Sequence, residues 1–213
     1  TVAALDLAPD APIRDVCGLL EETGVKVHLM VRNTDSFFGL SVSPDHGGPA
    51  VVINKWERIS VERWIFTAAH ELGHLLLHAS SYDRSLDSED PDQERQADRF
   101  ASYFLMPEPV FDAEWQETSG LPLLDRVLKV KRIFRVSYKT VLYRLTETKR
   151  VPKEAWGIFQ AQHKRRFGKG LTKVDEPERL REGEFRLNWA RAGEPDGLSE
   201  YDFVEDRLSR LVR

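Results

Sequence analysis

The sequence predicts an α+β fold, in which a small antiparallel sheet is followed by a series of helices. Short β-rich runs between residues 25 and 53 predict the sheet, and a dense apolar stretch at 61–78 predicts a central helix. Helix signals then continue to residue 145. With 213 residues, 41% of them hydrophobic, the chain is long enough for one packed domain or two small ones.

The first elements are a helix and three short strands. Apolar residues recur at helical spacing from Ile13 to Glu22, and Gly24 is well placed to end that helix. Turn-forming segments at 33–35 and 44–49 separate three β-rich runs, which are Val25–Val31, Phe37–Val42 and Ala50–Ile53. We expect these strands to pair as a small antiparallel sheet.

Two longer helices follow the strands. From about Val61 to His78, apolar residues cover most of the helix circumference, so this helix is expected to be central and largely buried. A second helix is expected to begin at Asp90-Pro91, because Asp is a good N-cap and Pro suits the first helical position. It should end at Met106-Pro107, because the residue before a proline is pushed out of helical geometry.

We divide the chain into three segments. Residues 1–117 form the first domain, which holds the sheet and the two longer helices. Residues 118–150 form a basic helical subdomain, because two short helices with a break near Arg135 are typical of a helix-turn-helix. Residues 151–213 are charged, partly helical and repeatedly interrupted by glycine, so the sequence predicts no architecture there. The first residue is Thr1 and not Met, which suggests a processed or excised chain with neighbouring domains missing.

The composition excludes several classes of protein. Cys17 is the only cysteine, so the chain can form neither an internal disulfide nor a cysteine cluster for a metal. The longest apolar run is far shorter than the roughly 20 residues that cross a bilayer, and the sequence begins with no signal pattern. We therefore expect a cytoplasmic protein without a membrane partner. The net charge is −4, yet nine basic residues and one acidic residue, Glu147, lie between Arg126 and Arg150.

The motif HExxH, at residues 70–74, points to a metal site. Four residues of α-helix turn through about 400°, so His70 and His74 project from one face and can share one ion. Hydrolytic zinc takes three protein ligands and leaves a position for water, which Glu71 can reach as a general base. The alternative is a chance spacing, but a Glu and two His in an apolar helix are costly to bury without partners.

The second long helix is expected to supply the third ligand. Glu94 and Asp98 are also four residues apart, so they share one face of that helix. Glu94 can complete a His₂Glu site, and Asp98 can accept a ring N–H from His70 or His74. The alternative is two solvated carboxylates on an acidic helix.

Two motifs in order resemble the ImmA/IrrE family of metallopeptidases. The first is FTAAHELGHLLLH at 66–78, and the second is ERQADRFA at 94–101 followed by LMP at 105–107. The resemblance covers residues 25–107 and extends loosely over 123–145. It implies a zincin-like, gluzincin-type core with Zn²⁺, or else Mn²⁺ or Fe²⁺, as the metal. The implied ligands are His70, His74 and Glu94, and the implied catalytic base is Glu71.

The resemblance also implies a function and a substrate. Family members are implied to cleave within a DNA-binding repressor of the helix-turn-helix class, so that stress, prophage or toxin–antitoxin genes are released from repression. We therefore expect a zinc endopeptidase that acts on such a repressor. Two alternatives stay open. One is a DNA-binding or repressor-sequestering regulator with a non-catalytic metal site, and the other is a small-peptide hydrolase.

Some further residues are candidates for other roles. Tyr82 can donate a hydrogen bond to an oxyanion. Arg135, Lys139 and Arg144 can neutralise the phosphates of a nucleic acid. The favoured interpretation is that this basic helical pair packs on the core or docks an acidic partner. Four residues are interpreted as mainly structural, namely Asn54, Arg63, His78 and Tyr103.

Overall fold

The computed structural model describes residues 12–13, 15–78, 90–182 and 185, and it confirms the α+β class. In these residues a three-stranded sheet is accompanied by seven α-helices and one 3₁₀ helix. None of these helices has the length and apolar character needed to cross a membrane. The elements are α1 Val16–Glu22, β1 Lys26–Met30, β2 Gly39–Val42, η2 Pro44–His46, β3 Ala50–Asn54, α2 Val61–Leu77, α3 Pro91–Leu105, α4 Glu108–Glu117, α5 Leu123–Phe134, α6 Tyr138–Glu147 and α7 Ala155–Phe167.

The sheet is mixed, so the prediction of an antiparallel sheet is wrong. Strand β3 lies between β1 and β2, parallel to β1 and antiparallel to β2. The chain therefore passes from β1 to the far edge of the sheet before it returns through the centre. The prediction pairs strands that are consecutive in the sequence. The turn-rich connection between β1 and β2 does not reveal that β3 lies between them in the sheet.

The buried side chain of Asn54 organises the connection at the end of β3. Its amide oxygen accepts a hydrogen bond from the backbone N–H of Arg32 at 2.9 Å. Its amide nitrogen donates to the backbone oxygens of Arg32 at 2.8 Å and Phe37 at 2.9 Å. These bonds satisfy polar backbone groups that the turn leaves unpaired, which is a structural role for Asn54.

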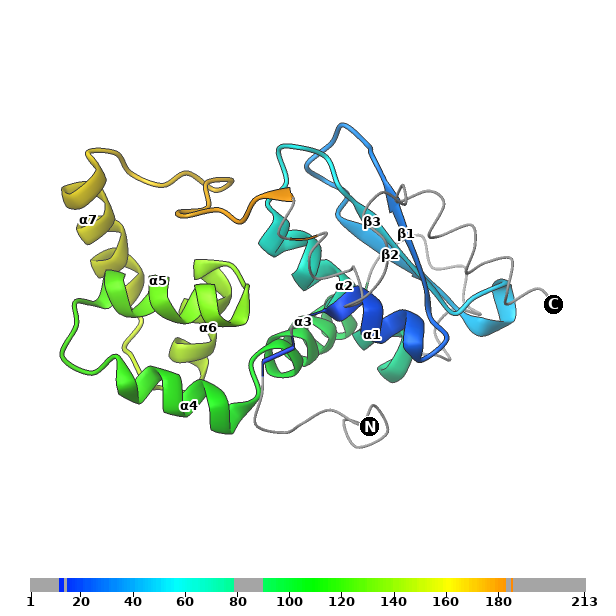
Figure 1. Cartoon of the computed structure of the whole chain (residues 1–213), viewed down its shortest axis with the longest axis horizontal. Coiled ribbons are helices and arrows are strands. Elements are labelled where there is room, and N and C mark those ends of the chain that lie inside the picture. The colour runs from blue at the N-terminus through cyan, green and yellow to red at the C-terminus, as the bar shows by residue number, and fades with distance from the viewer. Residues whose placement is uncertain (1–11, 14, 79–89, 183–184, 186–213) are drawn as a thin grey trace, which may run out of the picture.

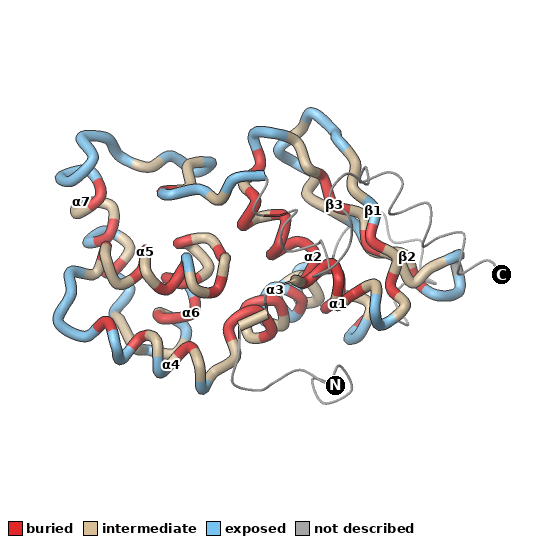
Figure 2. The backbone as a smooth tube through the Cα atoms, in the orientation of Figure 1, coloured by how far each residue is buried: buried red, intermediate tan, exposed pale blue. Residues whose placement is uncertain are grey.

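Helix α2 is the centre of the part of the molecule that holds the sheet. It packs on β2, β3, α1 and α3, and Figure 2 shows it as mostly buried. Ser60 caps its first turn by accepting from the backbone N–H of Arg63. Helix α3 begins at Pro91 after the N-cap Asp90 and ends before Met106. The predicted positions of both helices and the predicted burial of α2 are therefore confirmed.

The remaining helices form a second part of the molecule. Figure 1 shows α4, α5, α6 and α7 on one side, and the sheet with α1, α2 and α3 on the other. Helix α5 ends at Arg135, which has a left-handed backbone with φ of 56°, and Ser137 caps α6, so the predicted break is confirmed. Helix α7 packs on α5 and α6. The three-segment division of the chain stays a prediction.

A buried ionic cluster connects the two parts. Lys131 in α5 lies 2.9 Å from Glu62 Oε1 in α2 and 3.0 Å from Glu176 Oε1 in the segment after α7. All three side chains are at most 5% exposed. The same segment continues to α2, where the backbone N–H of Leu180 donates to Glu62 Oε1 at 2.9 Å. Charges in such a place need this pairing, because burial removes their hydration.

We expect Lys131→Met to lower the free energy of unfolding by about 3–5 kcal/mol, because it leaves two buried carboxylates without their cation. Urea denaturation measures the change. Lys129→Met is the matched control, since the side chain of Lys129 is 43% exposed and its nearest carboxylate, that of Glu117, is 3.5 Å away. The control should shift stability by less than about 0.5 kcal/mol. If the two variants were equally stable, the cluster would not hold the parts together.

Candidate metal centre

Three side chains from two helices converge on one point. The Nε2 atoms of His70 and His74 on α2 are 3.1 Å apart. Glu94, in the first turn of α3, places Oε2 at 3.3 Å from Nε2 of His70 and Oε1 at 3.1 Å from Nε2 of His74. One ligand atom from each residue lies within 4.8 Å of the other two. The structure therefore brings together the three residues that the sequence predicts as ligands.

These separations suit a single small cation. Two ligand atoms at about 2.0–2.1 Å from a tetrahedral ion are about 3.3 Å apart. The measured separations of 3.1 to 3.3 Å are close to that value. Two imidazole nitrogens and a carboxylate oxygen are also a donor set that zinc accepts. The side chain of Glu94 is 37% exposed, so the group is open to solvent on that side.

Small residues let α2 and α3 approach closely enough for this convergence. A Cβ atom on Gly73 would lie 3.2 Å from Cα of Ala97 and 3.1 Å from a ring carbon of Phe100. Ala97 and Ala101 are fully buried in the same contact. The glycine inside the HExxH motif is therefore needed for helix packing, which positions Glu94 against the histidines.

Further hydrogen bonds orient the two rings. Asp98 Oδ1 lies 2.9 Å from Nδ1 of His70, so the other ring nitrogen faces Glu94. His74 Nδ1 lies 3.0 Å from Nδ1 of His78, whose Nε2 is 3.2 Å from the amide oxygen of Gln96. Sequence reasoning missed Gln96. The signal for it was weak, because only the extra four-residue step from His74 to His78 indicated that the second ring has a partner.

The surroundings of the two rings move their pKa values in opposite directions. Burial opposes a charge on His70, but the hydrogen bond that its ring donates to Asp98 and the nearby carboxylates outweigh it, so the pKa of His70 is raised. Burial, together with His70 and His78, lowers the pKa of His74 to about 4. His74 is therefore neutral at pH 7, which is the form of imidazole that binds metals.

Glu71 lies on the sheet side of α2. Its side chain is almost fully buried, at 7% exposed. A Cβ atom on Gly39 would be 3.4 Å from Oε1 of Glu71, so this carboxylate is beside the edge strand β2. The charge of Glu71 contributes to the raised pKa of His70. The carboxylate is thus near enough to His70 to act on it electrostatically, and it is not one of the three converging side chains.

Comparison with known proteins identifies the family. The model of a peptidase family, M78, described as the IrrE N-terminal-like domain, matches residues 21–146. The chain belongs to this family. The resemblance noted in the sequence is therefore confirmed, and the family is a zinc-associated one. No curated protein matches the chain.

Solved structures give a weaker likeness to this M78 chain. One is a Mycobacterium tuberculosis transcriptional regulator, with 21% sequence identity and a TM-score of 0.43. The match covers 62% of this chain and 40% of that one. The M78 match itself includes the sheet and helices α2 to α6, and it ends before α7.

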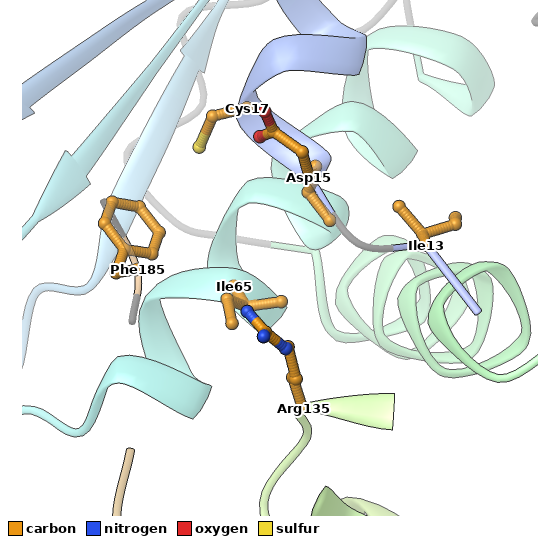
Figure 3. Close-up of a pocket in the computed structure, with 7 residues that line it drawn as sticks. Ile13, Asp15, Cys17, Ile65, Arg135 and Phe185 are labelled. Atoms are coloured by element: carbon orange, nitrogen blue, oxygen red, sulfur yellow. The ribbon is translucent and has the colours of Figure 1, made fainter. Parts of the chain in front are cut away.

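The three basic residues predicted as phosphate or partner contacts do not form an outward-facing set. Arg144 is fully buried and pairs with Glu108 at 2.6 Å, so its prediction as a phosphate or partner contact is wrong. Figure 3 shows Arg135 reaching toward Ile65 of α2, in a small pocket between the two parts. Lys139 donates to the backbone oxygen of Lys173. These partners were not predictable from the sequence, because they lie far along the chain.

The other two candidates are the tyrosines Tyr82 and Tyr103. Tyr82, predicted as an oxyanion donor, lies outside the described residues. Tyr103 packs against the guanidinium of Arg144, which lies 3.1 Å from its ring centroid. This contact agrees with the expectation that Tyr103 has a packing role.

We expect Gly73→Leu to lower the free energy of unfolding by about 1–3 kcal/mol, because the larger side chain forces α3 away from α2. The metal content of the protein should fall as well, since the displacement of α3 moves Glu94 away from His70 and His74. Urea denaturation and metal analysis measure both effects. The control is Gly157→Ala in α7, where an added Cβ meets nothing within 4 Å. A Gly73→Leu protein with normal stability and metal content would disprove the packing argument.

Proposed function

We propose that this M78 protein is a zinc-dependent endopeptidase with a zincin-like core. In this proposal His70, His74 and Glu94 bind the zinc, and Glu71 is the general base. The observation that carries it is the convergence of the two Nε2 atoms and the Glu94 carboxylate at 3.1 to 3.3 Å, with a buried carboxylate beside them. Mn²⁺ or Fe²⁺ would fit the same donors, so metal analysis has to identify the ion.

The reaction divides between the metal and the side chains. Zinc held by His70, His74 and Glu94 would supply a Lewis acid that polarises the scissile carbonyl and lowers the pKa of water toward about 7. Glu71 would accept a proton from the attacking water as the oxygen of that water bonds to the carbonyl carbon. Glu71 then gives the proton to the nitrogen of the leaving amine as the C–N bond breaks. Asp98 and His78 hold the two rings in orientation through their Nδ1 atoms.

A protein substrate follows from the peptidase family, and we propose that it is a helix-turn-helix repressor. The support for the repressor is the family resemblance of the sequence motifs. The test is to incubate the purified protein with the repressor encoded nearest to its gene. Specific cleavage there, without general degradation of unstructured peptides, would also exclude a small-peptide hydrolase.

The alternative function, a DNA-binding regulator, has less support. A helix-turn-helix reads DNA with residues near the start of its second helix. Here Ser137, Lys139 and Thr140, at the start of α6, line a cleft that α2 also lines. Arg144 is buried. These positions suit a contact inside the molecule better than a contact with a DNA groove.

We expect Glu71→Gln to retain zinc and to lower the cleavage rate by at least about 100-fold, because the amide cannot accept the proton. Zinc content and the rate of repressor cleavage are measured on the same preparation. The control is Glu154→Gln, since Glu154 is exposed and its side chain does not cap α7. Equal cleavage by wild type and Glu71→Gln would refute the assignment of the base.

We expect Asp98→Ala to weaken zinc binding by about 10- to 100-fold, because the ring of His70 loses the hydrogen bond that fixes it. Competition with a chromophoric chelator gives the affinity. Asp92→Ala is the control on the same helix, because the Asp92 side chain is 71% exposed and pairs with Arg95. An affinity change of the same size in both variants would show that Asp98 acts only through the net charge of α3.

A further inference from the structure

A cleft of about 680 Å³ separates the two parts of the molecule, and we call it the junction cleft. The first domain lines it with residues that include Phe38, Arg63 and Ser102. The helical part lines it with residues that include Lys139 and Trp156. Asp98, which is bonded to His70, is also in its lining, so the cleft reaches the candidate metal centre.

Arg63 lies on the same face of α2 as the two histidines. Seven residues separate it from His70, which is about 700° of rotation and about 10 Å along the helix axis. Its guanidinium lies 4.2 Å from the ring centroid of Phe38 and 5.5 Å from that of Phe66. Among the described residues, its buried Nε has no hydrogen-bond partner. Stacking on two rings therefore orients the cation. The carboxylates of Asp98, Glu71 and Glu94 act on it electrostatically, but none accepts a hydrogen bond from its Nε.

A second polar group in the cleft is also unsatisfied. Ser102 on α3 is 2% exposed, and its hydroxyl has no hydrogen-bond partner within the described part of the chain. A buried hydroxyl without a partner costs free energy, as does a buried guanidinium N–H. Both groups line the junction cleft, so a polar ligand there would satisfy both.

The lining holds four acidic residues and four basic ones, so its formal charge is balanced, but three of its carboxylates already have partners. The carboxylates of Asp98, Asp175 and Glu176 are held by His70, by the backbone N–H of Thr172 and by Lys131. The N-cap residues of α2 and α6, Ser60 and Ser137, also line the cleft, and helix N-termini favour negative charge. Burial lowers the pKa of Lys139, and Arg63 and Lys173 lower it further against the opposing charges of Glu176 and Asp175. The guanidinium of Arg63 and the two helix N-termini are therefore the groups in the cleft that favour an anionic ligand.

We propose that the junction cleft binds an acidic segment of the protein substrate, and that Arg63 pairs with a carboxylate of that segment. This inference rests on the proposed function. An extended peptide advances about 3.3 Å per residue, so a distance of about 10 Å along α2 corresponds to about three residues. The acidic residue therefore lies about three positions from the bond that is cleaved. Arg63 determines specificity and takes no part in the proton transfers.

The test measures binding with full-length, zinc-loaded Glu71→Gln protein, so that bound peptides stay intact. The probe is a randomised dodecapeptide pool, prepared once with free C-terminal carboxylates and once with C-terminal amides. Peptides retained by the immobilised protein are sequenced by mass spectrometry. We expect Asp or Glu to be enriched by at least about tenfold at one position, because hydrogen bonds between charged groups are strong. Enrichment of Asp or Glu in the amidated pool shows that the bound carboxylate belongs to a side chain. If only the pool with free C-terminal carboxylates is retained, the bound carboxylate is the C-terminal one.

The variants Arg63→Glu and Arg63→Gln should each remove this enrichment while zinc content stays normal. The control is Arg32→Glu, because Arg32 is exposed and also lies over a phenylalanine ring, that of Phe37 at 5.7 Å, but outside the cleft lining. Unchanged enrichment in both Arg63 variants would overturn the proposal. A parent protein that retains neutral peptides as well as acidic ones would overturn it too.

Cleavage of the retained peptides by the wild-type protein tests the proposed function separately. Acidic peptides that bind through Arg63 and stay uncleaved would contradict the peptidase mechanism and would support the cleft assignment. Cleavage without any acidic preference would overturn the cleft assignment and would support the mechanism.

Discussion

The close contact between α2 and α3 is the constraint on which the metal centre depends. Neither helix alone carries three ligands, and a carboxylate on α3 reaches two imidazoles on α2 only if the helix axes are near each other. Gly73 and Ala97 make that approach possible, because neither has a side chain beyond Cβ at the contact. The four-residue spacing on each helix then does two things at once. On α2 it aligns the rings of His70 and His74. On α3 it places Asp98 one turn after Glu94, where the Asp98 carboxylate contacts Nδ1 of His70.

A second constraint fixes the helical part against the first domain. Lys131 has three N–H donors, and Glu62, Glu176 and the backbone oxygen of Pro177 lie at 2.9, 3.0 and 2.7 Å from its nitrogen. Buried ion pairs add little net stability compared with apolar packing, but a set of directional bonds permits few alternative arrangements. The cluster therefore defines the relative position of α2 and α5. The width of the junction cleft depends on that position, since its walls come from both parts.

Much of the site was predictable from the sequence because its signals are local. The spacing within 70–74 and 94–98, the N-cap at Asp90 and the break at Arg135 each depend on residues fewer than five apart, and the structure has each of them. The order of the strands was not predictable, because it depends on contacts between distant residues. One example is Asn54, which bonds to the connection between β1 and β2 about twenty residues earlier in the chain. The partners of buried basic residues were not predictable for the same reason. Arg144 looks like a surface charge until α4 brings Glu108 to it from 36 residues away.

The arginines of the chain show why Arg63 is better explained by a ligand than by packing. Arg126 donates to the backbone oxygen of Trp115, and Arg144 and Arg150 donate to Glu108. Each of these partly or fully buried guanidinium groups thus has an oxygen acceptor within the protein. The guanidinium of Arg63 stacks on two rings and feels the charge of nearby carboxylates, but its buried Nε has no hydrogen-bond acceptor among the described residues, which is costly. A protein that needed only packing at this position would be more stable with an apolar side chain. Retaining a guanidinium on the face of α2 that carries both histidines makes sense if the missing acceptor arrives with the substrate.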